Sequence, residues 1–484
     1  MDKKIKFFER IIYDELEKIV GIENITTESV DKDVYSLDTY TLPRLWLERG
    51  CELPKPDYIV FPESTKQISK IVCLANTYKI PVIPRGGGAG GAGGVLPIYG
   101  GIIVDMKRMN KITKIDEKSL TVTVQTGILQ IDLEQPLNDK GYTLNHLPAS
   151  IYCSTLGGFL VNRGSGVLST KYGKIDDMVL SLQIVLPTGE IIRTLPVPEH
   201  SSGPELNRLF LGSEGTFGIV TEATLKIHSL PEERRFRAFL FNDLHSAIET
   251  GRKIMTSRLH PCVIRIYDEA DTRVWVKSVL GFDRERAAYM IIGFDGFKEV
   301  VDAEEKLTVD ICHEEKAEDL GEEPAKHWWN HRYDFYLPPH TLESSPPYLY
   351  DVIDTVATYE NIEKVYYAMK EGIENVYKEW EVTFVAHFSH WYEWGTIIYP
   401  NFIIKNPPKD PHEVLRLHNR IWDTGVRAAL KNGGVVNEHH GIGLKLGKFL
   451  KEQYGVGFKV LENIKKALDP NNIMNPGKLG FEGR

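Results

Sequence analysis

The chain lacks the features of a membrane-spanning or a secreted protein. It contains no run of about 18 apolar residues, the length that a helix needs to cross a bilayer. Its first residues are too rich in charge for a signal peptide. We therefore expect a cytoplasmic protein and leave peripheral association with a membrane open.

Cysteine is scarce, and charge of one sign is nowhere concentrated. The five cysteines are scattered without a C-x-x-C pair, which argues against a disulfide framework, a zinc ribbon or an iron–sulfur cluster held by this chain. The net charge of −9 is spread without a basic or acidic block, so nucleic acid is not an expected partner. We expect a small-molecule substrate.

Length and periodicity predict an α+β protein of several parts. The 484 residues exceed one ordinary core. Apolar residues recur at helical spacing between positions 5 and 20, and residues 58–104 alternate strand-like and helix-like segments. The predicted parts are an N-terminal helical segment (1–52), a ligand-binding domain (53–230), a substrate domain with an antiparallel sheet (231–430) and a C-terminal helical segment (431–484).

A glycine tract is the strongest local signal. Residues 84–94 hold seven glycines in eleven positions, between strand-like segments at 79–83 and 101–106. Residues without Cβ let a ligand approach bare N–H groups, which is how a backbone holds a pyrophosphate. The tract exceeds the G-x-G-x-x-G fingerprint, and no acidic residue ends a second strand about 20 residues later, so a nicotinamide cofactor is disfavoured. We expect another dinucleotide.

Two later stretches, 154–166 and 212–220, are also rich in small and hydroxyl residues. Taken singly, each is compatible with a tight turn. With the glycine tract, they make residues 55–230 resemble the FAD-binding domain of the vanillyl-alcohol oxidase and p-cresol methylhydroxylase (PCMH) superfamily. Residues 437–443 and 469–478 are similar to the closing signature of the branch that holds D-lactate, glycolate and D-2-hydroxyglutarate dehydrogenases and alkyldihydroxyacetonephosphate synthase.

The resemblance implies a fold and a cofactor. It predicts a PCMH-type FAD-binding domain of two subdomains, an α+β cap domain for the substrate, and a C-terminal helical segment that returns to the flavin. FAD should be held noncovalently, because the tract has no histidine for a tether. The residues expected to bind FAD are Pro84, Arg85, Gly86, Gly87, Gly88, Ala89, Gly90, Pro148, Ser154, Thr155, Gly158, Asn162, Gly164, Ser165, Glu214, Ile219, Val220 and Asn475.

The resemblance also implies a reaction, the dehydrogenation of a small 2-hydroxy acid such as D-lactate or glycolate by hydride transfer to flavin N5. His440 is the expected base, because an imidazole titrates near neutral pH. Glu438, His439 and Tyr399 complete the expected catalytic set.

Charged and metal-binding side chains are expected on the substrate side. Arg332 stands in a W-x-x-R pattern that resembles a carboxylate anchor, and Arg265 is its rival. His387 is expected at the substrate and, with Glu393 and His439, forms a candidate site for a divalent metal such as zinc. On one strand, positions 387 and 393 share a face, whereas His390 points elsewhere.

Other functions stay open. One is a flavin-dependent transferase like alkyldihydroxyacetonephosphate synthase, favoured by Tyr399 but weakened because His387 replaces an expected arginine. Another is a flavin-carrying subunit that needs partners. A third, an oxidase of aromatic alcohols or phenols, is suggested by Trp328, Trp329, Tyr333, Phe335, Trp391 and Trp394. We expect a homodimer that passes electrons to a quinone, an electron-transfer flavoprotein or an iron–sulfur protein.

Overall fold

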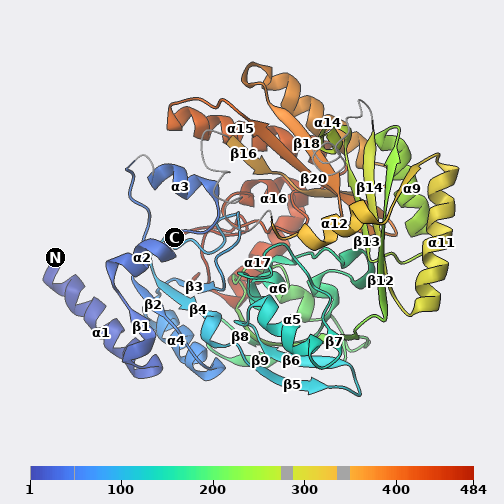
Figure 1. The fold of residues 1–484 in the computed structure, drawn as a ribbon. Helices are drawn as coiled ribbons and strands as arrows, with labels where there is room; N and C mark the ends of the chain where they lie inside the picture. The colour runs from blue at the N-terminus through green and yellow to red at the C-terminus, as the bar shows by residue number, and fades with distance from the viewer. Residues whose placement is uncertain (1, 48–49, 274–286, 335–348) are drawn as a thin grey trace.

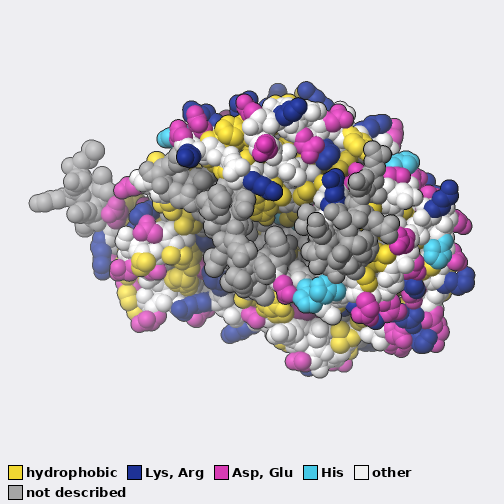
Figure 2. Space-filling view, turned by 45° about the horizontal axis from the view of Figure 1, so that its top comes forward, with side chains coloured by type: hydrophobic (Ala, Val, Ile, Leu, Met, Phe, Trp, Pro, Cys, Tyr) yellow, Lys and Arg dark blue, Asp and Glu magenta, His cyan; other side chains and the backbone are white. Residues whose placement is uncertain are grey.

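The computed structural model describes residues 2–47, 50–273, 287–334 and 349–484. Three groups of strands surround a central region in which helices α16 (Gly447–Tyr454) and α17 (Phe458–Leu468) lie (Figure 1). The described helices include none that combines the length and the apolar character needed to cross a membrane. Figure 2 shows acidic and basic side chains interspersed over the described part of one face, in keeping with the mixed charge of the sequence.

The first sheet has four strands in the order β1-β2-β4-β3. β2, β4 and β3 are parallel, and their residues are almost all buried, as expected for a parallel sheet with both faces covered. Helix α4 (Thr65–Tyr78) begins after Ser64, whose side chain accepts from the N–H of Gln67. Helix α1 (Asp2–Val20) packs against α4. The strands are β1 (Ile25–Thr26), β2 (Tyr58–Val60), β3 (Val82–Arg85) and β4 (Ile102–Asp105).

The second sheet is antiparallel, with five strands in the order β5-β6-β10-β8-β9. Apolar residues alternate along β6, so that one face builds a core with the helices beside it. The strands are β5 (Ile112–Asp116), β6 (Thr121–Gln125), β8 (Val179–Val185), β9 (Ile191–Arg193) and β10 (Ile219–Lys226). The helices are α5 (Gln130–Asn138), α6 (Leu156–Asn162), α7 (Ser169–Tyr172) and α8 (Asn207–Phe210), and β7 (Tyr142–Thr143) pairs with β11 (His228–Ser229).

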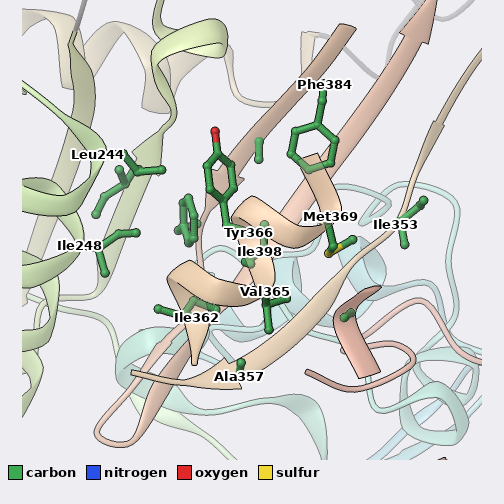
Figure 3. Close-up of a cluster of buried hydrophobic side chains, with 14 of the residues drawn as sticks. Leu244, Ile248, Ile353, Ala357, Ile362, Val365, Tyr366, Met369, Phe384 and Ile398 are labelled. Carbon is green, nitrogen blue, oxygen red and sulfur yellow. The ribbon is translucent and has the colours of Figure 1, made fainter. Parts of the chain in front are cut away.

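A nine-stranded antiparallel sheet follows in the order β15-β12-β14-β13-β18-β20-β16, with β17 and β19 also paired to β20. Its strands are β12 (Glu233–Phe241), β13 (Val263–Tyr267), β14 (Ala288–Gly296), β15 (Glu318–Gly321), β16 (Leu349–Val352), β17 (Thr355–Thr358), β18 (Thr383–Phe388), β19 (Trp391–Tyr392) and β20 (Gly395–Ile404). Its helices are α9 (Leu244–Thr256), α11 (Lys298–Glu314), α12 (Glu323–His331), α14 (Ile362–Val376) and α15 (Pro411–Lys431). Figure 3 shows Ile362, Val365 and Met369 along one face of α14 in the core of this region.

The C-terminal segment ties these regions together. Val82 in β3 donates to the carbonyl of Ile473, and Asn475 donates back to the carbonyl of Val82. The predicted α+β class, the antiparallel sheet of the substrate region and the C-terminal helices are confirmed. The predicted domain boundaries stay predictions.

Candidate active site

One large cavity of ≈ 1250 Å³ lies where the three regions meet. Its volume exceeds the roughly 300–1,000 Å³ of ordinary small-ligand pockets, so it can hold a dinucleotide together with a substrate. The glycine tract, the stretch from Pro148 to Val167 and the stretch from Glu214 to Val220 contribute to its wall. Of the residues expected to bind FAD, Asn475 alone does not line it.

Glycine is required in the tract because the second stretch lies against it. A Cβ on Gly86 would lie 2.1 Å from Thr155 Oγ1, and a Cβ on Gly87 would lie 1.9 Å from the carbonyl oxygen of Cys153. Gly90, in contrast, has open space where its Cβ would be. The tract therefore presents bare backbone to the cavity and to its neighbour at the same time.

The side chain of Arg85 joins the glycine tract to the N-terminal segment. Its guanidinium donates to the carbonyls of Tyr35 (3.1 Å) and Leu37 (2.8 Å) and lies over the Tyr35 ring. Burial lowers the pKa of Arg85. Arg85 therefore links the tract to the N-terminal segment, and its guanidinium lies against Gly88 in the tract.

The opposite wall comes from adjacent strands of the nine-stranded sheet. Tyr267 in β13 pairs with His387 in β18, which pairs with Tyr399 in β20, so these three side chains stand in a row on one face. The ring centroids of His387 and Tyr399 lie 4.5 Å apart in a stacked arrangement. The Tyr399 ring also lies 5.8 Å from His439 and 5.4 Å from His440.

The carboxylate of Asp354, which no sequence motif marked, organises the turn from Asn437 to Gly443, called here the histidine turn. Asp354, fully buried between β16 and β17, accepts from His440 Nδ1 at 2.7 Å and from the backbone N–H of His439 at 3.1 Å. Asn437 donates to Asp354 through Nδ2 (2.6 Å) and accepts from the N–H groups of His440 and Gly441 through Oδ1. Asp354 and His440 thus form a dyad in which His440 Nδ1 is engaged and His440 Nε2 is left for a substrate.

Neighbouring charges separate the pKa values of the histidines. Burial opposes a positive charge on His440, but the Asp354 carboxylate outweighs it and raises the pKa of His440. Burial and the nearby His440 lower the pKa of His439 to about 4. Burial and Arg265 hold the pKa of His387 well below its usual range. His440 is therefore the imidazole that can store a proton, beside two that stay neutral.

Glu438 does not line the cavity. It is buried, and its carboxylate accepts from Ser165 Oγ (3.0 Å), Lys174 Nζ (2.7 Å), Tyr392 Oη (2.7 Å) and His439 Nδ1 (2.6 Å). Burial opposes its charge, but Lys174 and His439 hold its pKa well below its usual range. The charged form of Glu438 is thus favoured, and its contact with His439 Nδ1 orients that ring.

Both predicted arginines line the cavity among aromatic rings. Arg265 Nε donates to Tyr267 Oη at 2.8 Å, and its guanidinium lies 5.8 Å from the Trp328 ring. The guanidinium of Arg332 lies between the rings of Trp329 (3.7 Å) and Tyr333 (4.3 Å). Stacked guanidinium groups keep N–H donors free at their edges, which suits them to bind a carboxylate.

Comparison with known proteins identifies the family. Residues 56–195 match the model of an FAD binding domain, and residues 230–479, more than half of the chain, match that of the FAD linked oxidases, C-terminal domain. The chain belongs to the FAD-linked oxidases. It is an FAD-linked oxidoreductase, and FAD is its cofactor.

Two curated relatives of this FAD-linked oxidase span most of its length. It is 32% identical over 453 residues to the alkyldihydroxyacetonephosphate synthase of Dictyostelium discoideum, a match that covers 88% of this chain and 73% of that protein. It is 28% identical over 473 residues to the glycolate oxidase subunit GlcD of Bacillus subtilis (strain 168), which covers 97% and 96%.

Solved structures confirm the predicted PCMH-type fold. An alkyldihydroxyacetonephosphate synthase superposes with a TM-score of 0.80 at 29% identity, over 96% of this chain and 84% of that one. A p-cresol methylhydroxylase with substrate bound superposes with a TM-score of 0.75 over 98% and 97% of the two chains, and at 18% identity this shows the fold alone.

The described residues fit FAD. The glycine-lined end of the cavity carries the backbone of Gly86, Gly87 and Gly88, whose N–H groups suit a pyrophosphate. The other end carries the histidine turn, as a flavin with a substrate over it requires. Noncovalent attachment stays a prediction.

The predicted metal site is corrected. Strand β18 ends at Phe388, so the alternation that was to bring His387 and Glu393 to one face breaks, and Glu393 lies exposed between β19 and β20. His390, expected to point elsewhere, instead lies with Glu438 and His439, all within reach of one ion. A second such group is Asp354, His439 and His440. Hydrogen bonds within the site already link members of both groups.

Two further expectations are corrected. Asn475 stands behind the cavity, where Nδ2 donates to the carbonyls of Gly94 and Glu214. Of the aromatic set, Trp328 and Tyr333 line the cavity, whereas Trp391 belongs to the core and Trp394 is exposed. Trp329 stacks on Phe236. Phe335 lies outside the described residues.

Sequence reasoning missed Asp354, Asn437 and Lys174. Asn437 was detectable, because it begins the histidine motif and asparagine side chains commonly bond the backbone of a following turn. Asp354 and Lys174 are far from the histidines in the chain, and nothing in the sequence marks them as their partners.

Proposed function

We propose that this FAD-linked oxidoreductase dehydrogenates a small 2-hydroxy acid, of the D-lactate or glycolate kind. The observation that carries the proposal is the Asp354–His440 dyad, which faces a cavity that Arg265 and Arg332 also line. A base beside permanently charged anchors is what the oxidation of an anionic alcohol needs. The glycolate oxidase subunit among the relatives supports the same class.

Each residue near the cavity has a separate role in the proposed dehydrogenation. Arg265 or Arg332 binds the substrate carboxylate and fixes the hydroxyl toward His440. His440 Nε2 takes the hydroxyl proton, and Asp354 at Nδ1 stabilises the imidazolium that results. Bound FAD supplies the acceptor for the hydride from the substrate Cα. Tyr399 and His387 cover the sheet side and exclude water there.

The proposal is tested by anaerobic titration of the FAD-loaded protein with D-lactate, L-lactate, glycolate, D-2-hydroxyglutarate and a 4-alkylphenol, followed by the flavin absorbance near about 450 nm. Bleaching by one of the hydroxy acids, lost in His440→Gln and weakened in Arg265→Met or Arg332→Met, supports the proposal. Bleaching by the phenol alone supports the aromatic-alcohol oxidase instead. A protein that no member of the series bleaches would rule the proposal out.

A transferase is the second candidate, because Tyr399 stands against both histidines and the chain is 32% identical to an alkyldihydroxyacetonephosphate synthase. Such an enzyme forms its product without net reduction of the cofactor. Formation of alkyldihydroxyacetone phosphate by a protein whose flavin stays oxidised through the panel would favour it.

We further propose that reoxidation uses a partner. A quinone, an electron-transfer flavoprotein or an iron–sulfur protein would accept the electrons, and the protein would act as a homodimer. Light scattering of the purified protein measures the oligomeric state. Reoxidation rates with a soluble quinone, an electron-transfer flavoprotein and molecular oxygen separate the acceptors.

A further inference from the structure

Glu214 joins the FAD-binding region to the histidine turn. It lies in the third glycine-rich stretch, is buried, and has a left-handed backbone with φ 48°. Its carboxylate accepts from the backbone N–H groups of Ile442 at 2.5 Å and Gly443 at 2.8 Å. These two N–H groups follow directly on His440 and Gly441, so Glu214, which also lines the cavity, holds the end of the histidine turn.

Four further hydrogen bonds link Glu214 and the residues after the turn to the glycine tract. Asn475 Nδ2 donates to the carbonyl of Glu214 at 2.7 Å and to that of Gly94 at 2.9 Å. The backbone N–H groups of Leu444 and Lys445 both donate to the carbonyl of Ala92, at 2.9 and 3.1 Å. Gly94 and Ala92 form the far end of the tract whose near end offers its backbone to FAD.

The histidine turn packs closely against Glu214 and the glycine tract. A Cβ on Gly441 would lie 3.0 Å from Glu214 Oε1 and 2.9 Å from Asn162 Oδ1. A Cβ on Gly443 would lie 2.1 Å from the carbonyl oxygen of Ala92. Both glycines have left-handed backbones, with φ 87° and 50°. Displacement of the tract or of Glu214 must therefore displace the turn that carries His440.

We propose that Glu214 is a positioning residue that couples cofactor loading to the geometry of the Asp354–His440 dyad, with Asn475 as its support. When FAD orders the glycine tract and the third stretch, Glu214 and Asn475 order the turn from Asn437 to Gly443. The catalytic imidazole is then in place only in the loaded protein. The proposal rests on FAD binding and on the hydrogen bonds above, and holds whichever substrate the protein uses.

Hydrogen exchange in the turn tests the coupling without a substrate. Exchange is measured for peptides covering residues 437–446, with and without FAD, in the wild type, in Glu214→Gln and in Glu222→Gln. Glu222 is a matched control, because it lies in the neighbouring strand β10 and its carboxylate pairs with Arg193 near the surface. Bound FAD is quantified in each sample.

FAD should slow exchange in the wild-type turn by about tenfold or more, as expected for amides that bond to a buried carboxylate. In Glu214→Gln, Nε2 faces one of the two N–H donors, so this protection should fall to less than about twofold while FAD stays bound. Glu222→Gln should keep the wild-type response. Equal protection in Glu214→Gln and the wild type would overturn the coupling.

The reductive half-reaction gives a second measurement once the titration has identified a substrate. The limiting rate of flavin reduction should fall about tenfold or more in Glu214→Gln, whereas the substrate dissociation constant should change less than about twofold, because the arginines are untouched. If Glu214→Gln does not fold or load FAD, Glu214→Asp and Asn475→Ala replace it. Both should also lose the FAD-dependent protection, and retention of it in both would overturn the proposal.

Discussion

Asp354 raises the pKa of His440 and fixes its tautomer. The imidazole must be neutral to take a proton, so the rate of flavin reduction should rise with pH through the pKa of His440, which Asp354 raises above its usual value of about 6.5. In the wild type, the midpoint of this rise in rate should therefore lie above about pH 6.5. Asp354 also fixes the proton on Nδ1 and leaves Nε2 as the acceptor.

We predict that Asp354→Asn lowers the maximal rate of reduction about 100-fold or more, because it removes the partner of the imidazolium. The rising limb of the pH profile should move to lower pH, since the cause of the raised pKa is gone. Stopped-flow reduction at a series of pH values measures both effects. Asp310→Asn, on the exposed face of α11, is the control, and a limb that stays in place in Asp354→Asn would contradict the assignment.

FAD affinity should fall when Gly87 is replaced by alanine and stay nearly unchanged when Gly90 is. In Gly87→Ala the new Cβ meets the backbone carbonyl of Cys153 at 1.9 Å, so one stretch of the cofactor site must move. We expect FAD affinity to fall about tenfold or more, from a clash of roughly 1–3 kcal/mol. In Gly90→Ala the Cβ enters open space, so affinity should change less than about twofold. Fluorescence titration with FAD measures both, and equal affinities would contradict the close approach.

Among the elements, the histidine turn from Asn437 to Gly443 positions the imidazole that we propose as the base. Asn437 Oδ1 accepts from His440 (2.8 Å) and Gly441 (3.0 Å), and its Nδ2 donates to Asp354. The turn places His439 on Glu438 and His440 on Asp354.

We predict that Asn437→Ala keeps bound FAD but lowers the limiting rate of reduction about tenfold or more. Three hydrogen bonds of about 0.5–1.5 kcal/mol each are lost, and they fix the direction of the imidazole. Asn471→Ala removes a single side-chain hydrogen bond to Asn76 and serves as the control. The FAD content after gel filtration and the single-turnover rate are the measurements, and a wild-type rate in Asn437→Ala would remove the turn from the mechanism.

On the scale of the whole molecule, the cavity belongs to no single region. Its wall combines the glycine tract, the stretches at 148–167 and 214–220, four strands of the nine-stranded sheet and the histidine turn. The C-terminal segment adds a link, because Ile473 and Asn475 pair with Val82 beside the tract. Cofactor binding should therefore stabilise all of these parts together.

We predict that FAD raises the melting temperature of the chain as a single transition. At a free concentration of 100 times its dissociation constant, a ligand that binds only the folded state adds about 2.7 kcal/mol to the free energy of unfolding. Calorimetry of the FAD-free and FAD-loaded protein measures the shift. Two transitions, of which FAD moves one alone, would show that the regions unfold independently.

The sequence by itself determined the local features of this protein. Density of glycine at 84–94 marks backbone that a ligand approaches, and apolar periodicity predicts helices such as α1 and α4, because both depend on neighbours in the chain. The resemblance that these motifs carry to a known family also implied FAD and the PCMH-type fold.

Only the tertiary structure decided which side chains meet. Asp354 reaches His440 across 86 positions, and Lys174 reaches Glu438 across 264, through sheet pairing that no local pattern encodes. The early end of β18 separated Glu393 from His387, and the approach of two distant segments joined Glu214 to the histidine turn and placed Asn475 behind the cavity. Contacts between remote segments depend on how whole sheets pack, so they appear only in the folded chain.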